Sequence, residues 1–377
     1  MRDYVDGIRS FALIQIGKRR IGPGEMTYVV AEISANHDQR FEHAATLIHL
    51  AKEAGADAVK VQTYTADTLT IQSDLEYFRI SGGTLWDGRT LYDLYRRASM
   101  PWEWQPELKA IADRLNIDFF STPFDDSAVD FLERMGVPVF KLASFEIVDL
   151  PLIRRIARTR KPLVLSTGMA SRQEIHEALQ AFRQAGGVEV ALLKCTSAYP
   201  ARADEMHLRT IAHMAKTFRV PVGLSDHTLG TTVPVSAVAL GACIVEKHFT
   251  SSRAVQGPDS SFSLVPDEFA QMVAAIRIAE KALGNVHYGA TAEEEKSLRF
   301  RRSLFVVTTV KAGEPFTTAN VSSIRPWNGL HTRYLEEILG RVAVRDIERG
   351  TPLTWELISD GPSIGSPQSP PSRHIDL

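Results

Sequence analysis

The stretches Gly223-Leu-Ser-Asp-His-Thr228 and Val245-Glu-Lys-His-Phe-Thr250 each begin as an apolar, strand-like run and break into polar residues. Between them, residues 231–242 have the composition of a short crossover helix. A strand, a helix and a second parallel strand place the ends of both strands at the same edge of a sheet. We therefore expect His227 and His248 to lie together there. A lone histidine is more often structural, but two converging imidazoles with open positions favour a divalent-metal site.

Six further apolar runs in the chain end in polar residues in the same way. They are Tyr28–Ile33, Ala58–Val61, Asp118–Phe120, Val139–Lys141, Pro162–Leu165 and Val190–Leu193. Helical patterns such as Glu42–Ala54 and Arg172–Gln184 lie between most of them. Eight strands alternating with helices predict an α/β fold, the TIM (β/α)₈ barrel, whose active sites lie at the C-terminal ends of the strands.

Two segments depart from a minimal barrel. Residues 11–29 are predicted to form a short hairpin that closes the other end of the barrel. Residues 64–104 form a long connection, rich in Tyr and Trp, in which no clear helix is predicted before Trp104. Such an insertion serves either as a wall or lid of the substrate site or as a small satellite core, and the sequence favours neither.

The strand–helix alternation stops after about Gly284, which indicates a second domain. The predicted organisation is a barrel domain over residues 1–285, a charged linker over 286–299, a small β-rich domain over 300–358 and a disordered tail over 359–377. The tail is rich in Pro, Ser and Gly and has little apolar content. A β-rich domain of about 60 residues would be marginally stable alone, so it is expected to pack on something larger.

The composition excludes several classes of protein. A formal charge of −2 over 377 residues argues against a binder of nucleic acid. No stretch approaches the roughly 20 apolar residues of a membrane span. The two cysteines, Cys195 and Cys243, fall in apolar runs, as expected for buried free thiols in a reducing compartment. Charged residues near the N-terminus leave no apparent signal peptide, so a cytoplasmic location is expected.

Two lysines, Lys60 and Lys141, stand near the ends of predicted strands. Hydroxyl side chains follow the strands as well: Thr122, Ser144, Ser166, Thr167, Ser197 and Ser225. Together they predict a cationic, donor-rich pocket for a small anion. A Schiff base or a structural ion pair is the alternative role for either lysine.

Carboxylates face the same predicted mouth. Glu32 and Glu146 could act as acid or base, orient sugar hydroxyls, ligate metal or pair with the lysines. Asp226 could be a metal ligand or a group that orients an imidazole. Asp259 follows the last strand in Gly257-Pro-Asp259 and also projects toward the mouth.

Several motifs, in order along the chain, resemble those of the sialic acid synthase family. They are Ala31–His37, Lys60–Gln62, Lys141–Ser144, Ser166–Met169, Cys195–Pro200, Gly223–Thr228 and Val245–Thr250, and residues 300–358 resemble the family's C-terminal domain, which is similar to type III antifreeze proteins. Leu85–Tyr95, Met100–Trp104 and Ser121–Asp125 look most like the pseudaminic acid branch of the family. The resemblance covers nearly all of the chain except the tail.

The resemblance implies condensation of phosphoenolpyruvate with an open-chain amino sugar, 2,4-diacetamido-2,4,6-trideoxy-L-altrose for the pseudaminic branch, to give a nine-carbon 2-keto acid and phosphate. It implies a divalent ion (Mn²⁺, Mg²⁺ or Co²⁺) on His227 and His248. It assigns phosphoenolpyruvate binding to Lys60, Thr122, Lys141, Ser144, Ser197 and Ser225. It assigns the sugar side to Glu32, Gln62, Tyr199 and Asp259, with Glu146 as a candidate acid/base group.

The resemblance also implies a domain-swapped homodimer. In the family, an arginine of an Arg-Pro-Gly-x-Gly loop reaches the sugar in the partner's barrel, and Arg325 inherits that role. Two residues depart from the family's pattern. Ser197 replaces a frequent Asn, and Trp327 stands at the glycine position of the loop, where a positive φ would be costly.

Three other functions compete with this one. N-acetylneuraminate and legionaminate synthases use the same chemistry on other sugars. A class I aldolase would use Lys60 or Lys141 as a Schiff base and leave the histidine pair without a role. An ice-binding module would need a flat, uncharged face, whereas the C-terminal domain carries five arginines: Arg325, Arg333, Arg341, Arg345 and Arg349.

Overall fold

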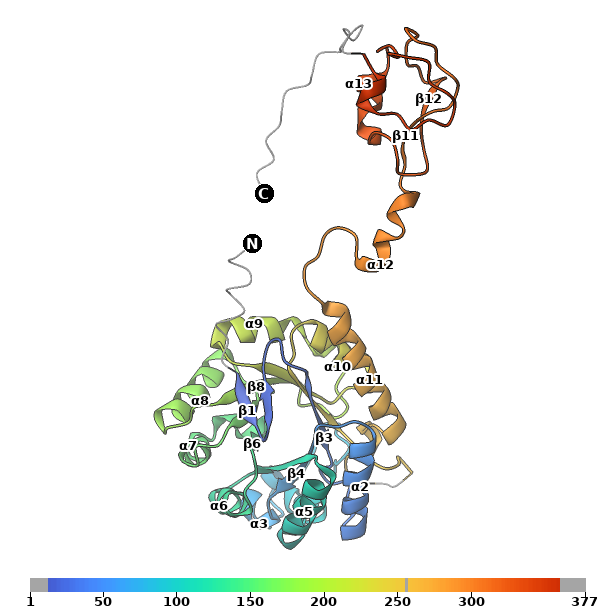
Figure 1. Ribbon diagram of the computed structural model, residues 1–377. Coiled ribbons are helices and arrows are strands. Elements are labelled where there is room, and N and C mark those ends of the chain that lie inside the picture. Colours follow the sequence, from blue (N-terminus) through green and yellow to red (C-terminus); the bar gives the residue numbers. More distant parts are fainter. Residues whose placement is uncertain (1–12, 255–256, 360–377) are drawn as a thin grey trace. The chain divides into compact units, whose positions relative to one another are not determined.

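The computed structural model describes residues 13–254 and 257–359 of the chain (Figure 1). No signal peptide was expected at the N-terminus, and residues 1–12 lie outside the described residues. Disorder was expected for the tail, and residues 360–377 lie outside them as well. The chain divides into two compact units after Gly284.

The first unit is a closed barrel of eight parallel strands, in the order β10-β3-β4-β5-β6-β7-β8-β9, with helices around it (Figure 1). The strands are β3 (Tyr28–Glu32), β4 (Ala58–Thr63), β5 (Asp118–Pro123), β6 (Phe140–Leu142), β7 (Leu163–Ser166), β8 (Val190–Cys195), β9 (Val222–Asp226) and β10 (Ile244–His248). All eight predicted strands are present, and the TIM-barrel prediction is confirmed.

The helices of the barrel bury an apolar face against the strands. They include α2 (Phe41–Glu53), α5 (Gln105–Leu115), α6 (Asp126–Met135), α7 (Leu150–Arg158), α8 (Arg172–Gln184), α9 (Arg209–Phe218), α10 (Thr232–Ala239) and α11 (Pro266–Leu283). Helix α8 begins at a capping box in which Ser171 and Glu174 exchange hydrogen bonds between side chain and backbone. No helix in the described part of the chain is both long and apolar enough to cross a membrane.

A two-stranded hairpin, β1 (Ile14–Ile16) with β2 (Arg19–Ile21), precedes the barrel. Its isoleucines are fully buried in the core together with Tyr28 of β3. Gly17 at its turn lies against Asp118, at the amino end of β5, with room for no Cβ. The predicted hairpin is therefore confirmed, and it covers the amino ends of the strands.

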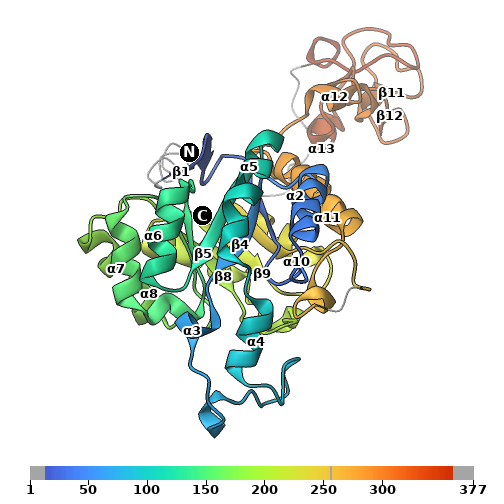
Figure 2. The same cartoon turned by 90° about the horizontal axis from the view of Figure 1, so that it is seen from below.

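The long connection after β4 contains more structure than the sequence predicted. It carries α3 (Ala66–Leu69), a 3₁₀ turn at Glu76–Phe78, α4 (Leu91–Ala98) and a second 3₁₀ turn at Trp102–Trp104. The prediction of no clear helix before Trp104 is wrong, because Thr90 caps α4 by accepting a hydrogen bond from the Asp93 backbone N–H at 3.1 Å. Figure 2 shows α3 and α4 at the end of the barrel opposite β1. The insertion therefore stands on the side where the strands end.

The second unit is a small β domain with its own core. Strands β11 (Ser303–Val306) and β12 (Val321–Ile324) pair antiparallel, and the short helices α12 (Ala292–Glu295) and α13 (Leu335–Ile338) belong to the same unit. Leu304, Phe316 and Leu353 lie in its buried core. Gly329 passes so close to the Leu304 carbonyl oxygen that a Cβ there would lie 2.1 Å from it, so only glycine fits.

Candidate active site

Alternation along β9 and β10 decides which side chains enter the barrel. The two strands pair with Ser225 opposite Glu246 and Asp226 opposite Lys247. Successive side chains of a strand point to opposite faces. Ser225, Glu246 and His248 consequently face the barrel interior, where His227 joins them just beyond the end of β9.

The two histidines lie together, as predicted, with ring centroids 5.3 Å apart. The Nδ1–H of His227 donates to the Thr196 carbonyl oxygen at 2.9 Å, which leaves its Nε2 lone pair free. The Nδ1 of His248 is buried and has no hydrogen-bond partner among the described residues. Burial lowers the pKa of His248 well below its ordinary value, so its ring is neutral, as a metal ligand must be.

These residues fit a divalent ion held by few protein ligands. Within the described ranges, no group of three or more His, Cys, Asp or Glu side chains is placed to hold a metal ion. An ion on His227 and His248 would therefore take its remaining ligands from water and substrate. Such a site would leave several positions open for water and substrate.

The two lysines form a buried ionic cluster beside the histidines. Lys60 pairs with Glu32 and lies 3.8 Å from Glu246, and Lys141 Nζ lies 4.0 Å from the same Glu246 oxygen. Burial alone would lower the pKa of Lys60, but Glu246 and Glu32 raise it. Burial lowers the pKa of Lys141, and it raises that of Glu32 to about 7 despite the nearby Lys60.

Glu246 is the functional residue that the sequence analysis missed. It joins both lysines and accepts a hydrogen bond from Ser225 Oγ at 3.1 Å. Burial opposes its ionisation, but Lys141 and Lys60 hold its pKa below the ordinary value. The signal was present in the sequence, because Glu246 precedes His248 by two residues and so shares its face of the strand.

Of the predicted hydroxyl residues, Thr122, Ser144, Ser166 and Ser225 line the cavity with the lysines, whereas Thr167 and Ser197 do not. Lys60 Nζ donates to Thr122 Oγ1 at 3.3 Å, and Lys141 Nζ donates to Ser166 Oγ at 2.7 Å. Ser144 and Ser197 hydrogen bond to each other at 2.7 Å. Gly168, with φ of +46°, permits that contact, since a Cβ there would lie 2.5 Å from the Ser144 Cβ.

Of the predicted sugar-side residues, Glu32, Gln62 and Tyr199 line the cavity, and Asp259 lies outside its lining. Gln62 donates to Ser34 Oγ at 3.0 Å and to Glu32 at 3.3 Å. The Tyr199 ring lies 4.3 Å from the His227 ring, and Asp259 Oδ2 is 3.8 Å from His248 Nδ1. These groups present acceptors, donors and an aromatic face beside the histidines.

Glu146 lies apart from this group. Unlike the neighbouring Ser144 and Phe145, it does not line the cavity, and its Oε2 is buried without a hydrogen-bond partner among the described residues. Burial raises the pKa of Glu146 to about 7. The carboxyl group can therefore hold or release a proton at neutral pH.

Asp226 does not act on a metal or an imidazole. It points away from the cavity lining and binds Lys247 Nζ at 2.5 Å, with both side chains fully buried. The Thr228 backbone N–H and hydroxyl also donate to it, at 3.0 and 2.9 Å. The prediction that Asp226 is a metal ligand or orients an imidazole is wrong, since β-strand alternation turns its carboxylate to the opposite face.

Arg325 belongs to the second unit and follows β12. Trp327, two residues later, does not have a positive φ, so the cost foreseen for a side chain at this position does not arise. Its ring contacts His331 edge-to-face at a centroid distance of 5.5 Å.

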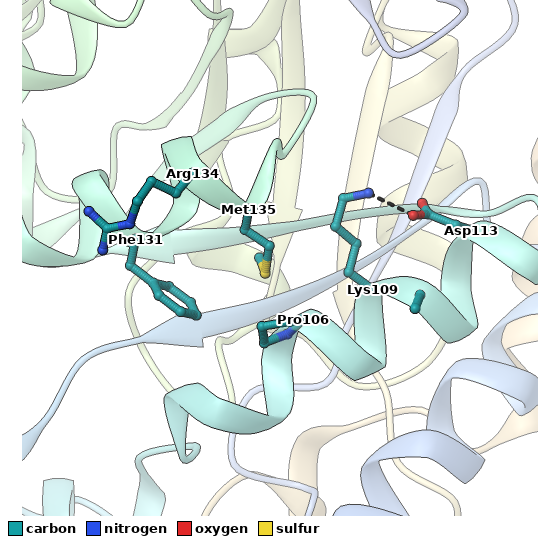
Figure 3. A pocket seen from close by; sticks show the side chains of 7 residues that line it. Pro106, Lys109, Asp113, Phe131, Arg134 and Met135 are labelled. Carbon is teal, nitrogen blue, oxygen red and sulfur yellow. Dashed lines mark hydrogen bonds and ion pairs between the residues drawn. The ribbon is translucent and has the colours of Figure 1, made fainter.

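A larger groove of about 440 Å³ lies outside the barrel, between α5 and α6 (Figure 3). Pro106, Phe131 and Met135 line it, and Lys109 pairs with Asp113 at 2.8 Å at its edge. It has neither the buried charges nor the imidazoles of the barrel mouth. The chemistry therefore belongs at the mouth, in the smaller cavity.

Family models match both units of the chain. The NeuB family model matches residues 47–288, and the SAF domain model matches residues 301–359. The chain is 44% identical to a pseudaminic acid synthase of Campylobacter jejuni over 90% of this chain and 98% of that protein. It is 36% identical to an N,N'-diacetyllegionaminic acid synthase of the same species, over 85% and 96%.

A solved structure has the same fold. The N-acetylneuraminic acid synthetase of Leptospira borgpetersenii, in complex with citrate, aligns with a TM-score of 0.69 at 30% identity and covers 77% of this chain and 96% of its own. The chain therefore belongs to the NeuB family of nonulosonic acid synthases and carries an SAF domain after its barrel.

Proposed function

We propose that the protein is a pseudaminic acid synthase. It would condense phosphoenolpyruvate with 2,4-diacetamido-2,4,6-trideoxy-L-altrose and water to give pseudaminic acid and phosphate. The observation that carries the reaction class is the pair of buried lysines beside two histidines at one barrel mouth. The higher identity to a pseudaminic acid synthase, 44% against 36% for a legionaminic acid synthase, favours this sugar.

Phosphoenolpyruvate carries a phosphate and a carboxylate, and the lysine cluster suits both. Lys60 and Lys141 supply buried positive charge, Thr122, Ser144 and Ser225 line the cavity beside them, and Ser197 hydrogen bonds to Ser144. Because Glu246 already lies near both lysines, the cluster is preorganised rather than formed on binding.

In the reaction, C3 of phosphoenolpyruvate attacks the sugar aldehyde, and water adds at C2 before the C–O bond to phosphate breaks. A divalent ion on His227 and His248 would supply a Lewis acid for the aldehyde and for that water. The aldehyde oxygen gains a proton and the water loses one. We assign both transfers to Glu146, because burial raises the pKa of its carboxyl group to about 7; since its side chain does not line the cavity, it would give a proton to the aldehyde oxygen and take one back from the attacking water through one bridging water. Glu32, Gln62, Tyr199 and Asp259 hold the sugar.

The class I aldolase alternative has one observation in its favour, the lowered pKa of Lys141. Against it, Lys141 Nζ donates to Ser166 Oγ and to the Leu142 carbonyl oxygen, at 2.7 and 2.9 Å, which withholds the amine from attack. Borohydride treatment with pyruvate separates the two, since only a Schiff base would be trapped as a stable adduct.

The proposed sugar is tested by phosphate release. The purified protein is assayed with phosphoenolpyruvate and Mn²⁺ against the L-altrose derivative, the legionaminic acid precursor and N-acetylmannosamine. The highest kcat/KM is expected with the L-altrose derivative. A higher value with either other sugar would assign the protein to that branch, and no phosphate release with any of them would refute the reaction.

We further propose that the active protein is a domain-swapped homodimer. Apolar side chains that follow strands at the mouth, Phe145, Val148, Met169 and Leu229, are exposed in the single chain. We propose that the SAF domain of a second copy covers these side chains and that its Arg325 reaches the sugar.

Subunit mixing tests this assembly. If Arg325 acts in the partner's site, a heterodimer of Arg325→Ala and His248→Ala subunits has one intact site and one doubly impaired site. Activity should return to about half of wild type per heterodimer. If each subunit closed its own site, every site would carry one lesion and the mixture would stay inactive.

A further inference from the structure

The insertion between β4 and α5 contains an ordered loop at the mouth. Its two arms pair through the Ile80 N–H, which donates to the Arg89 carbonyl oxygen at 2.8 Å. At the tip, the Asp87 carboxylate accepts hydrogen bonds from the Thr84 backbone N–H at 2.9 Å and from the Thr84 hydroxyl at 2.6 Å. These hydrogen bonds within the loop fix its shape, and Trp86 lies at its tip between Thr84 and Asp87.

Trp86 is directed at the active site. Its ring centroid lies 5.7 Å from that of Tyr199, whose own ring lies 4.3 Å from His227. The residues on either side, Leu85 and Asp87, are exposed, whereas Trp86 is half-buried. Two aromatic rings thus lead from the loop to a histidine of the proposed metal pair.

The indole N–H of Trp86 has no acceptor. Its Nε1 atom is buried, yet no described residue accepts a hydrogen bond from it. Indole nitrogen can only donate, and a buried indole N–H normally finds a partner, because an unmet donor costs free energy. The missing acceptor is explained if it arrives with a substrate.

We propose that Trp86 is a specificity-determining residue whose indole N–H donates to an acetamido carbonyl oxygen of the sugar. The inference rests on the proposed function and names one contact within it. A neutral single donor on an apolar ring suits an amide carbonyl and its methyl group. It suits the phosphate and carboxylate of phosphoenolpyruvate less well, and the buried lysines already match those charges.

Trp86→Phe tests the contact, because it keeps an aromatic ring against Tyr199 and removes the N–H. The KM for the diacetamido sugar should rise about tenfold, as for loss of one hydrogen bond, while the KM for phosphoenolpyruvate stays within about twofold. Thermal melting checks that the variant is folded.

Trp102→Phe is the matched control from the same insertion. The Trp102 indole N–H already donates to the Tyr64 carbonyl oxygen at 3.2 Å, so its loss should lower stability and leave the sugar KM unchanged. An unchanged sugar KM in Trp86→Phe, or an equal rise in the KM of both substrates, would overturn the proposal.

The two proposals fail in different ways. A wild-type protein that turns over the diacetamido sugar, with a Trp86→Phe variant that does so equally well, overturns only the role of Trp86. A wild-type protein that releases no phosphate with any acetamido sugar overturns the function and this contact together.

Discussion

Replacing Lys247 by Met should destabilise the barrel strongly. Lys247 and Asp226 are fully buried, with Nζ and Oδ2 2.5 Å apart, and Lys247 also donates to the Thr228 carbonyl oxygen. The substitution leaves a carboxylate in the interior with only its two Thr228 contacts. Removing one partner of a buried ion pair costs roughly 3–5 kcal/mol.

The double variant Lys247→Met/Asp226→Asn separates the cost of an unpaired charge from the value of the pair. It removes both charges and nearly preserves volume, so it should be more stable than Lys247→Met alone. For a domain of this size, Lys247→Met should lower the Tm by roughly 6–20 °C. The double variant should recover most of that loss.

Thermal and urea melts of the wild type, Lys247→Met, Asp226→Asn and the double variant give the coupling free energy. Lys109→Met is the control, because it breaks an ion pair of similar length, 2.8 Å to Asp113, on the surface of α5. That change should cost less than about 1 kcal/mol. A Tm for Lys247→Met within about 2 °C of wild type would refute the reasoning, as would strictly additive losses in the double variant.

EDTA should abolish activity and Mn²⁺, Mg²⁺ or Co²⁺ restore it, and His227→Ala or His248→Ala should lower turnover by orders of magnitude in a folded protein; full activity after chelation would exclude the metal. In ¹⁸O-water the released phosphate should stay unlabelled, whereas label there would mean attack at phosphorus. Lys60→Met and Lys141→Met should each raise the KM for phosphoenolpyruvate roughly 10- to 150-fold, by losing contacts of roughly 1.5–3 kcal/mol; normal affinity with lost chemistry would point instead to a Schiff base. Burial raises the pKa of Glu146 to about 7, so its acid form is lost as pH rises through that value and kcat should fall there. The same fall in Glu146→Gln would exclude Glu146 as the donor.

The barrel could be predicted because its signal repeats. Each strand is a short buried run that ends in polar residues, and eight repetitions with helices between them leave few other folds. The pairing of His227 with His248 followed from topology alone, since a crossover unit places the two strand ends together. The bounds of α8, Arg172–Gln184, were also predicted correctly, because a capping box marks its start.

Strand alternation was the information left unused. Every second side chain of a strand points to the same face, so Glu246 shares the pocket-facing side with His248 and Lys247 points outward. By the same rule, Asp226 points outward, away from the metal site. The sequence analysis considered the polar residues at the ends of strands and did not consider a charged residue within a strand, such as Glu246.

The insertion could not be predicted in detail for a different reason. Helix α4 spans only Leu91–Ala98, and although Leu91, Leu94, Tyr95 and Ala98 follow a helical spacing, the segment is shorter than the window of about 11–18 residues in which such a period is read. The contact between Trp86 and Tyr199 joins positions 113 residues apart, and nothing in local sequence encodes such a contact.

The barrel closes by pairing its last strand with its first, with His248 opposite Glu32. During synthesis, therefore, the mouth does not exist until β10 has emerged and joined β3, more than 200 residues after β3 was made. A ligand that needs both Lys60 and His248 binds only the closed barrel and adds its binding free energy to that final step. Phosphoenolpyruvate and the metal ion would then act on the folding of a newly made chain, favouring the closed barrel before any sugar is turned over.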